Sequence, residues 1–392
     1  MKKVLGIILE LNPLHNGHKY FIDNAKNIVK PDITIAIIST NFTMRGEINV
    51  INKFDRTKIL LDLGVDIVLE LPFNLGVLSA DYFAYNAINS LNKLEITDLA
   101  FGAELDDLDK LKYINELTTS NIFNCELKKN LDKGYSYSTS CNNALKLLTN
   151  DLDIITNYSL PNNTLGLQYL RAIEKINPNI NVTLIKRIDN NYYDDNISNS
   201  LASATSLRIL LQNNRDISEY VPRHINNNYI DINLANNNLF KILYYKAISN
   251  DLIYYGSKEG IENRLEKNIK VSRTLSEVVE RTITKRYTVN YINRLILHIL
   301  NETDLDFPVD PDYVRVLGFN NDIKSYFKTL KYKKGIITNI KDTNNIIAKN
   351  ELKATKLYSL VTENYDLYLN EYKVPIIKNK WLWRWNKWTR QK

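Results

Sequence analysis

Two histidines, His15 and His18, stand three residues apart near the start of the chain, with Gly17 between them. The apolar run at residues 3–9 before them is typical of a buried strand, whereas apolar residues spaced i, i+4 and i+7 after them predict a helix. The pair is therefore expected where a strand turns into a helix, and the free N–H groups of a helix N-terminus attract phosphate. Imidazoles there can donate hydrogen bonds to an α-phosphate and to departing pyrophosphate, as stabilisers of charge rather than as nucleophiles.

The composition of the whole chain is that of a soluble globular protein. Its 392 residues allow two domains, with 44% hydrophobic and 24% charged residues. A net charge of +7 favours a polyanionic partner such as nucleic acid.

Only two cysteines occur, not in a Cys-x-x-Cys arrangement, so neither a disulfide framework nor a zinc site is expected, and we predict no metal ligands. No apolar stretch is long enough to span a bilayer, so we expect a cytoplasmic protein without membrane contact.

The first half of the chain alternates between expected strands and expected helices. Strands are predicted at 3–9, 33–39, 65–71, 97–101 and 181–186, and helices at 54–63, 80–91 and 160–176, with another helix starting near residue 201. This alternation indicates an α/β fold with a doubly wound parallel sheet. Ligands bind such sheets at the carboxyl ends of the strands.

The pattern changes after residue 213. Long helical segments are expected at 239–248, 259–269 and 275–300, the last interrupted near 284–288, and no alternating strands are apparent. Residues 213–237 are expected to be the linker region. We therefore predict two domains, a catalytic domain at 1–213 and a mainly α-helical, basic domain at 214–392.

Several residues at expected strand ends and helix starts are further candidates for ligand binding. Each has a simpler structural interpretation: a tight turn, a helix cap or a surface charge. The candidates are Gly102, Asn162, Arg187, Ile188, Ser203 and Thr205.

Two basic stretches in the second half are candidates for RNA contact. Lys285-Arg286 beside Tyr287, at a helix junction, suits a phosphate and a stacked base, although an ordinary solvated turn fits equally well. All four tryptophans lie within 381–388, interleaved with basic residues. Docking of that face onto the protein is the first interpretation, RNA contact the second and a membrane surface the third.

Motifs along nearly the whole chain resemble one family. Asn12-Pro13-x-His15-x-Gly17-His18 is similar to the signature of the HxGH nucleotidyltransferase superfamily, whose members attack the α-phosphate of a nucleotide. The wider set resembles the bacterial tRNA(Met) cytidine acetate ligase family, and it comprises 10–18, Asn41-Phe42, 45–47, 101–104, 186–188, 203–205, 259–264, 284–288 and 315–319.

The resemblance implies a HUP-like nucleotidyltransferase domain and a reaction in two steps. Acetate and ATP, the latter with Mg²⁺, would give acetyl-adenylate, and the acetyl group would then pass to the wobble cytidine of elongator tRNA(Met), forming N(4)-acetylcytidine. A small-metabolite adenylyltransferase of the same class is the alternative, and a non-catalytic RNA-binding protein is a further one. No phosphate loop of the Walker type and no acetyl-CoA pyrophosphate loop is apparent.

The resemblance also implies roles for particular residues. Together with the chemistry above, it leads us to expect His15, His18 and Arg187 to be catalytic and Lys285, Arg286 and Tyr287 to bind tRNA. The nucleotide would be held by Gly102, Asn162, Ile188, Ser203 and Thr205 and by the histidine segment, namely Ile7, Ile8, Leu9, Glu10, Leu11, Asn12, Pro13, Leu14, Asn16, Gly17, Lys19 and Tyr20. The chain departs from the family at Leu11 and Leu14, where aromatic residues are usual, and at Tyr193, near which a histidine is usual.

Overall fold

The structure, a computed structural model, describes residues 2–187, 202–222, 228–249, 252–308 and 312–378. Its centre is an eight-stranded sheet with the order β5-β4-β1-β2-β3-β6-β7, with β8 also paired to β6. The strands are β1 (Val4–Leu9), β2 (Ile33–Ser39), β3 (Ile67–Leu71), β4 (Asp98–Ala103), β5 (Asn181–Lys186), β6 (Val314–Asn320), β7 (Ile336–Ile337) and β8 (Ile376–Lys378). β1 to β5 run parallel, as predicted, and β6 is antiparallel to β3.

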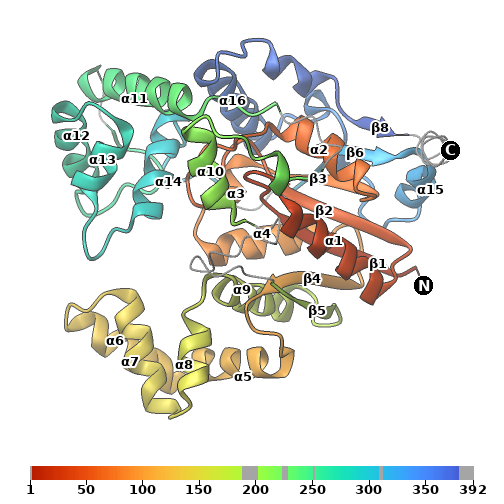
Figure 1. Cartoon of the computed structure of the whole chain (residues 1–392), viewed down its shortest axis with the longest axis horizontal. Coiled ribbons are helices and arrows are strands. Elements are labelled where there is room, and N and C mark those ends of the chain that lie inside the picture. The colour runs from red at the N-terminus through yellow and green to blue at the C-terminus, as the bar shows by residue number, and fades with distance from the viewer. Residues whose placement is uncertain (1, 188–201, 223–227, 250–251, 309–311, 379–392) are drawn as a thin grey trace.

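Helices cover both faces of the sheet (Figure 1). One face carries α1 (Asn16–Val29) and α2 (Lys53–Asp62), and the other carries α4 (Ala80–Asn92) and α9 (Pro161–Ile176), with the short α3 (Phe73–Gly76) before α4. The lobe at the bottom of Figure 1 consists of α5 (Leu108–Thr119), α6 (Asn121–Asp132), α7 (Tyr137–Leu148) and α8 (Leu152–Tyr158). α10 (Ala204–Gln212) and a 3-10 turn (Ser218–Tyr220) complete the first half.

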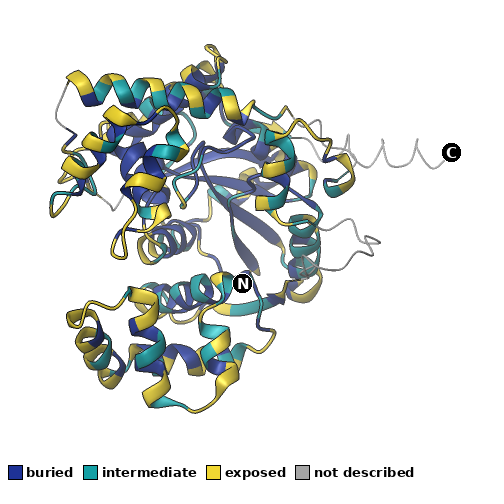
Figure 2. Ribbon diagram, turned by 60° about the vertical axis from the view of Figure 1, so that its left-hand side comes forward, coloured by how far each residue is buried: buried dark blue, intermediate teal, exposed yellow. Residues whose placement is uncertain are grey.

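Alternating side chains of each buried strand supply two separate cores. In β1, Leu5 and Ile7 belong to the core under α1 and α2, whereas Val4 belongs to the core under α4 and α9. Both faces of the strands are therefore apolar, which is why continuous apolar runs predicted them correctly. Figure 2 shows the strands as the most deeply buried part of the molecule.

The second half is mainly helical, as predicted. Its helices α11 to α14 lie on the left of Figure 1, whereas α16 lies at the top and α15 and β8 lie on the right. Its longer helices are α11 (Ile232–Ser249), α12 (Ile261–Val271), α13 (Leu275–Thr282), α14 (Val289–Leu300) and α16 (Ile346–Val361). The shorter ones are α15 (Lys324–Phe327) and 3-10 turns at Asn321–Ile323, Ile340–Asp342 and Leu367–Tyr372. The predicted interruption near 284–288 is confirmed as the turn between α13 and α14.

Two expectations for the second half need correction. α11 begins at Ile232, so the helix includes the end of the segment expected to be a linker. The strands β6, β7 and β8 were not expected, yet β6 joins the central sheet beside β3. The core under α1 and α2 also continues into α11, α14 and α16. The two parts thus share both a sheet and a core, and the division into two domains at residue 213 stays a prediction.

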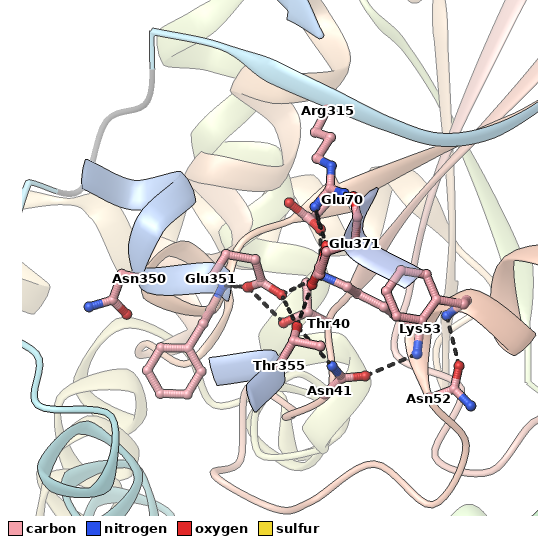
Figure 3. A network of polar contacts seen from close by, with 12 residues as sticks. Thr40, Asn41, Asn52, Lys53, Glu70, Arg315, Asn350, Glu351, Thr355 and Glu371 are labelled. Atoms are coloured by element: carbon pink, nitrogen blue, oxygen red, sulfur yellow. Dashed lines mark hydrogen bonds and ion pairs between the residues drawn. The ribbon is translucent and has the colours of Figure 1, made fainter. Parts of the chain in front are cut away.

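A network of buried charges fastens the second half to the sheet (Figure 3). The Lys53 Nζ atom of α2 lies 2.7 Å from Glu70, 2.6 Å from Glu351 and 2.7 Å from Glu371. Arg315 of β6 contacts Glu70 at 3.1 Å and Glu371 at 2.5 Å. All five side chains have 0% exposure, so the network joins α2, β3, β6, α16 and the last 3-10 turn away from the protein surface.

The charges in this network do not balance, because three carboxylates face two cations. Burial raises the pKa of Glu351, and the carboxylates of Glu70 and Glu371 add to that shift. The Glu351 carboxyl is compensated by hydrogen bonds from the backbone N–H of Phe73 at 2.6 Å and the Thr40 hydroxyl at 3.2 Å. Burial also raises the pKa of Glu371, but the charges of Lys53 and Arg315 outweigh burial and leave that pKa lowered.

No helix among the residues that the structure describes has the length and apolar character needed to cross a membrane.

Candidate active site

The two histidines lie at the N-terminus of α1, next to the carboxyl end of β1. His15 is the N-cap of the helix, and its Nδ1 accepts a hydrogen bond from the Gly17 N–H at 3.1 Å. The His15 N–H in turn donates to Nδ1 of His18 at 3.2 Å, and the two rings lie 3.9 Å apart. Because both Nδ1 atoms accept, each neutral ring carries its proton on Nε2, so both Nε2–H groups remain as donors.

Gly17 makes this arrangement possible. A Cβ atom at this position would lie 2.8 Å from Cε1 and 2.9 Å from Nδ1 of His15, closer than side-chain atoms normally approach. The glycine therefore allows the His15 ring to fold over the first turn of the helix.

Both imidazoles are held in the neutral form. Burial, together with the nearby charge of Arg187, lowers the pKa of His15 to about 4. Burial also lowers the pKa of His18, and the neighbouring His15 and Arg187 add to that shift. Neutral rings still donate from Nε2, and they avoid repulsion from the cation beside them.

A prediction for the pH dependence follows. Between pH 8 and pH 5 we expect kcat/KM for ATP to show no inflection near 6.5, because the pKa of His15 lies near 4 in the folded protein. Since the unfolded chain binds that proton more readily, the stabilising contribution is complete above pH 6.5 and is lost as the pH falls through 4. A pH–rate profile for the free enzyme measures this. An inflection near 6.5 that disappears in His15→Asn would contradict it.

Arg187, Asn162 and Gly102 are brought together beside the histidines. Arg187 follows β5, its N–H donates to the Ala103 carbonyl at 2.9 Å, and its guanidinium donates to the Asn162 side-chain oxygen at 3.1 Å. A Cβ on Gly102 would lie 3.4 Å from the Arg187 side chain. The charge of Arg187 also contributes, after burial, to the lowered pKa of both histidines. Ile188 lies outside the described residues.

Glu104 positions this second group. Its Oε1 accepts from the backbone and the side-chain nitrogens of Asn162, at 3.2 and 2.6 Å, and its Oε2 accepts from the Asn163 N–H at 2.9 Å. A carboxylate thus caps α9, which has no side-chain cap of its own. The cap fixes the direction of the Asn162 side chain toward Arg187.

Glu10 and the loop after β2 form another side of the site. The Met44 N–H donates to Glu10 Oε1 at 2.7 Å, while buried Arg56 donates to the Glu10 carbonyl at 2.7 Å and to the Ser39 carbonyl at 2.9 Å. Burial raises the pKa of Glu10, although the Met44 hydrogen bond and the charge of Arg45 oppose this shift. Glu10 is therefore a carboxylate of increased basicity within the histidine segment.

Arg208 holds the histidine segment from the other side. Its Nη1 donates to the Asn12 carbonyl at 2.7 Å, and its Nη2 lies 3.0 Å from Glu47 and 3.3 Å from the Thr205 hydroxyl. The Asn12 side chain donates to the Ile48 carbonyl and accepts from the Val50 N–H, so two hydrogen bonds connect the histidine segment to the loop after β2. Ser203 caps α10 by accepting from the Ser206 N–H, so the structure places its side chain at the start of that helix and not in a hydrogen bond with either histidine.

The other predicted nucleotide-binding residues occupy varied places. Leu11 and Leu14 are completely buried, and Leu11 has a left-handed backbone with φ of 58°, which is costly for a leucine. Lys19 is exposed and paired with Asp23. Ile7, Ile8 and Leu9 are within β1, Pro13 is buried beside Asn12, Asn16 donates to the Glu219 carbonyl, and Tyr20 is half-buried.

The predicted tRNA-binding residues lie in the turn between α13 and α14. Lys285 is exposed, and Arg286 pairs with Glu259 at 2.6 Å. Tyr287 is only 8% exposed, and its hydroxyl donates to Glu259 at 3.0 Å. Lys285 and Arg286 therefore face solvent, whereas stacking of a base on Tyr287 would require its ring to leave a packed position beside Tyr291.

Sequence reasoning missed three residues of this site: Arg56, Glu104 and Glu47. Arg56 is a fully buried cation in a helix next to apolar residues, which is a signal in itself. Glu104 and Glu47 lie in the motifs 101–104 and 45–47 that resemble the family, but they were given no role, because their partners are distant in the chain. Among the described residues, no group of three or more His, Cys, Asp or Glu side chains is placed to hold a metal ion.

A family model described as HIGH Nucleotidyl Transferase matches residues 1–372. The fold and the histidine pair thus define a nucleotidyltransferase of the HIGH class. Two curated relatives are each named tRNA(Met) cytidine acetate ligase. The one from Thermosipho africanus is 36% identical, covering 88% of this chain and 86% of its own, and the one from Caldicellulosiruptor saccharolyticus is 34% identical, covering 94% and 96%. The chain belongs to the tRNA(Met) cytidine acetate ligase family.

Two solved structures share the whole architecture. Thermotoga maritima TmcAL without ligand has a TM-score of 0.84 and 28% identity, covering 96% of this chain and 100% of its own. The same protein bound with alpha-thio ATP has a TM-score of 0.82 at the same identity and coverage.

Proposed function

We propose that the protein is an ATP-dependent acetate ligase that forms acetyl-adenylate and acetylates the wobble cytidine of elongator tRNA(Met). The observation that carries the proposal is the pair of neutral imidazoles whose Nε2–H donors remain after both Nδ1 atoms are engaged. The names of the relatives and the ATP analogue on the similar structure support it. Because the acceptor is tRNA, we place the protein in the cytoplasm.

In the first step, an acetate oxygen attacks the α-phosphorus of ATP, and the bond to pyrophosphate breaks. Acetate is already ionised near neutral pH, so the step requires alignment and stabilisation of charge rather than a base. His15, His18 and Arg187 supply two hydrogen-bond donors and one cation for that charge. ATP would enter as its Mg²⁺ complex, with the ion as part of the substrate.

In the second step, the exocyclic amine of cytidine attacks the acetyl carbon. A C–N bond forms, the bond to the phosphate oxygen breaks and AMP leaves. The amine loses one proton, for which the AMP phosphate and Glu10 are the two nearby acceptors. Burial raises the pKa of Glu10, so its carboxylate is a stronger base than that of an ordinary glutamate.

The proposal is tested by incubating the protein with labelled acetate, ATP and bulk tRNA, followed by digestion to nucleosides. We expect labelled N(4)-acetylcytidine that depends on all three components. Acetate-independent pyrophosphate exchange with another small acid would instead favour the small-metabolite adenylyltransferase.

The tRNA-binding prediction is tested by Lys285→Ala together with Arg286→Ala. We expect acetate-dependent pyrophosphate exchange to stay near normal, while tRNA affinity falls and its log–log salt slope decreases by about 2, because two phosphate contacts are lost. Filter binding over a range of salt concentrations measures this.

The matched control is Lys333→Ala together with Lys334→Ala, which removes the same charge from another exposed pair. If both double variants lowered tRNA affinity equally, the loss would reflect total charge alone and would exclude a tRNA-binding site at Lys285 and Arg286. A lowered melting temperature in the first variant alone would assign its effect to the Arg286–Glu259 pair.

A further inference from the structure

A cavity of about 460 Å³ lies between the first half of the chain and the helices of the second. Its floor is the loop after β2 together with α10, and its walls are α11, α13 and α14. The apolar walls include Leu239, Val279, Ile283 and Ile296, whereas Glu47 and Arg208 are the charged pair at the floor. Its volume is within the range of sites for small organic ligands. Further polar side chains in the lining are Gln212, Asn236, Ser276, Glu280 and Asn293.

The floor of the cavity connects directly to the histidine segment. Arg208 donates to the Asn12 carbonyl at 2.7 Å, and Asn12 is three residues before His15. The Met44 N–H in the same loop bonds Glu10 at 2.7 Å. Arg208 alone would therefore separate a ligand that contacts Glu47 and Arg208 from the segment proposed to hold the adenylate.

The loop is also pressed against the helices. Gly46 has φ of 79°, and a Cβ there would lie 2.5 Å from the Arg294 nitrogen of α14, so no larger residue fits. Arg294 also donates to the Met44 carbonyl at 3.3 Å. The cavity is thus built from elements of both halves, and Arg208 connects it to the segment proposed to hold the nucleotide.

We propose that this cavity receives the acceptor cytosine of the tRNA, turned out of its loop. The inference rests on the proposed function. It adds where the cytosine binds and which side chains recognise it. A carboxylate accepts a hydrogen bond from the exocyclic amine of cytosine, and an arginine donates to its ring nitrogen and carbonyl oxygen. Glu47 and Arg208 present this combination side by side. The apolar walls would cover the faces of the ring.

The same pair would discriminate against uracil. Uracil carries a carbonyl oxygen where cytosine carries the amine, so the Glu47 carboxylate would face another acceptor. One good pair of this kind gives roughly tenfold discrimination or more.

The test blocks the entrance of the cavity without changing the interior. Ile283 lines the cavity and is 37% exposed, so Ile283→Trp can narrow the entrance. Ile248→Trp, at a position 58% exposed and outside the lining, is the matched control. We expect Ile283→Trp to transfer acetyl to tRNA at least tenfold more slowly, while acetate-dependent pyrophosphate exchange stays within twofold. The control should retain both.

Wild-type transfer by Ile283→Trp would overturn the cavity proposal and leave the proposed function intact. Absence of tRNA acetylation by the wild-type protein would overturn the proposed function itself. If Ile283→Trp lost pyrophosphate exchange as well, the substitution would have disturbed the fold. Val289→Trp, at a lining position that is 48% exposed, would then test the cavity proposal by the same two assays.

A second measurement tests the reading of the base. The wild-type protein should bind a tRNA transcript with cytidine at the wobble position about tenfold more tightly than one with uridine. In Glu47→Gln the preference should vanish, because an amide can donate as well as accept. An unchanged preference in Glu47→Gln would overturn the proposed role of Glu47.

Discussion

Replacement of His18 by alanine should slow acetate-dependent pyrophosphate exchange about 100- to 1,000-fold, the usual effect of removing one donor to a developing negative charge. The Nδ1 of His18 accepts from the His15 N–H, so its Nε2–H is the donor that is lost. The KM for ATP should change less than kcat, because the contact strengthens as pyrophosphate leaves.

His15 requires a variant that separates catalysis from helix capping. Alanine would remove both the donor and the N-cap, whereas His15→Asn keeps an acceptor for the Gly17 N–H. We expect His15→Asn to keep its melting temperature and still lose exchange by about 100-fold. Wild-type turnover in both His18→Ala and His15→Asn would rule out the proposed site.

The second large effect is on stability. Replacement of Lys53 by methionine should lower the free energy of unfolding by about 3–5 kcal/mol, because it leaves buried carboxylates without their shared cation. Lys53 contacts Glu70, Glu351 and Glu371, all with 0% exposure (Figure 3). Denaturant-induced unfolding measures the loss, provided that the transition is cooperative.

Two comparisons make this prediction specific. Lys58→Met on the same helix removes an exposed pair with Asp55 and should cost no more than about 1 kcal/mol. Adding Glu351→Gln to Lys53→Met should restore part of the loss, because one of the uncompensated charges disappears. A cost for Lys53→Met no greater than that for Lys58→Met would contradict the account of the network.

The sequence predicted the elements whose signals are local. The five parallel strands were recognised as apolar runs, and the break at residues 284–288 was recognised from a change in helical periodicity. β6 was missed because Arg315 and Gly318 interrupt its apolar run, and both are explained only by distant partners. Arg315 meets Glu371, and a Cβ on Gly318 would lie 2.7 Å from Thr57 of α2.

The same limit applies to the site. The histidine pair was found from its spacing because the strand, the glycine and the helix that position it are adjacent in the chain. The contact between Arg208 and Asn12 and the cap that Glu104 provides for α9 join segments far apart, so no local pattern indicates them. Glu70 was the available signal for the charge network, since it interrupts the fully buried strand β3.

The central claim is that an acetate oxygen attacks the α-phosphorus of ATP at the histidine pair. Acetate labelled with ¹⁸O in both oxygens tests it most directly, with mass spectrometry of the products after acetyl transfer to tRNA. Because the bond to the acyl carbon breaks in the second step, one ¹⁸O should remain on AMP, one should appear in the acetyl group, and pyrophosphate should carry none. Unlabelled AMP, or ¹⁸O in inorganic phosphate together with ADP, would contradict the account.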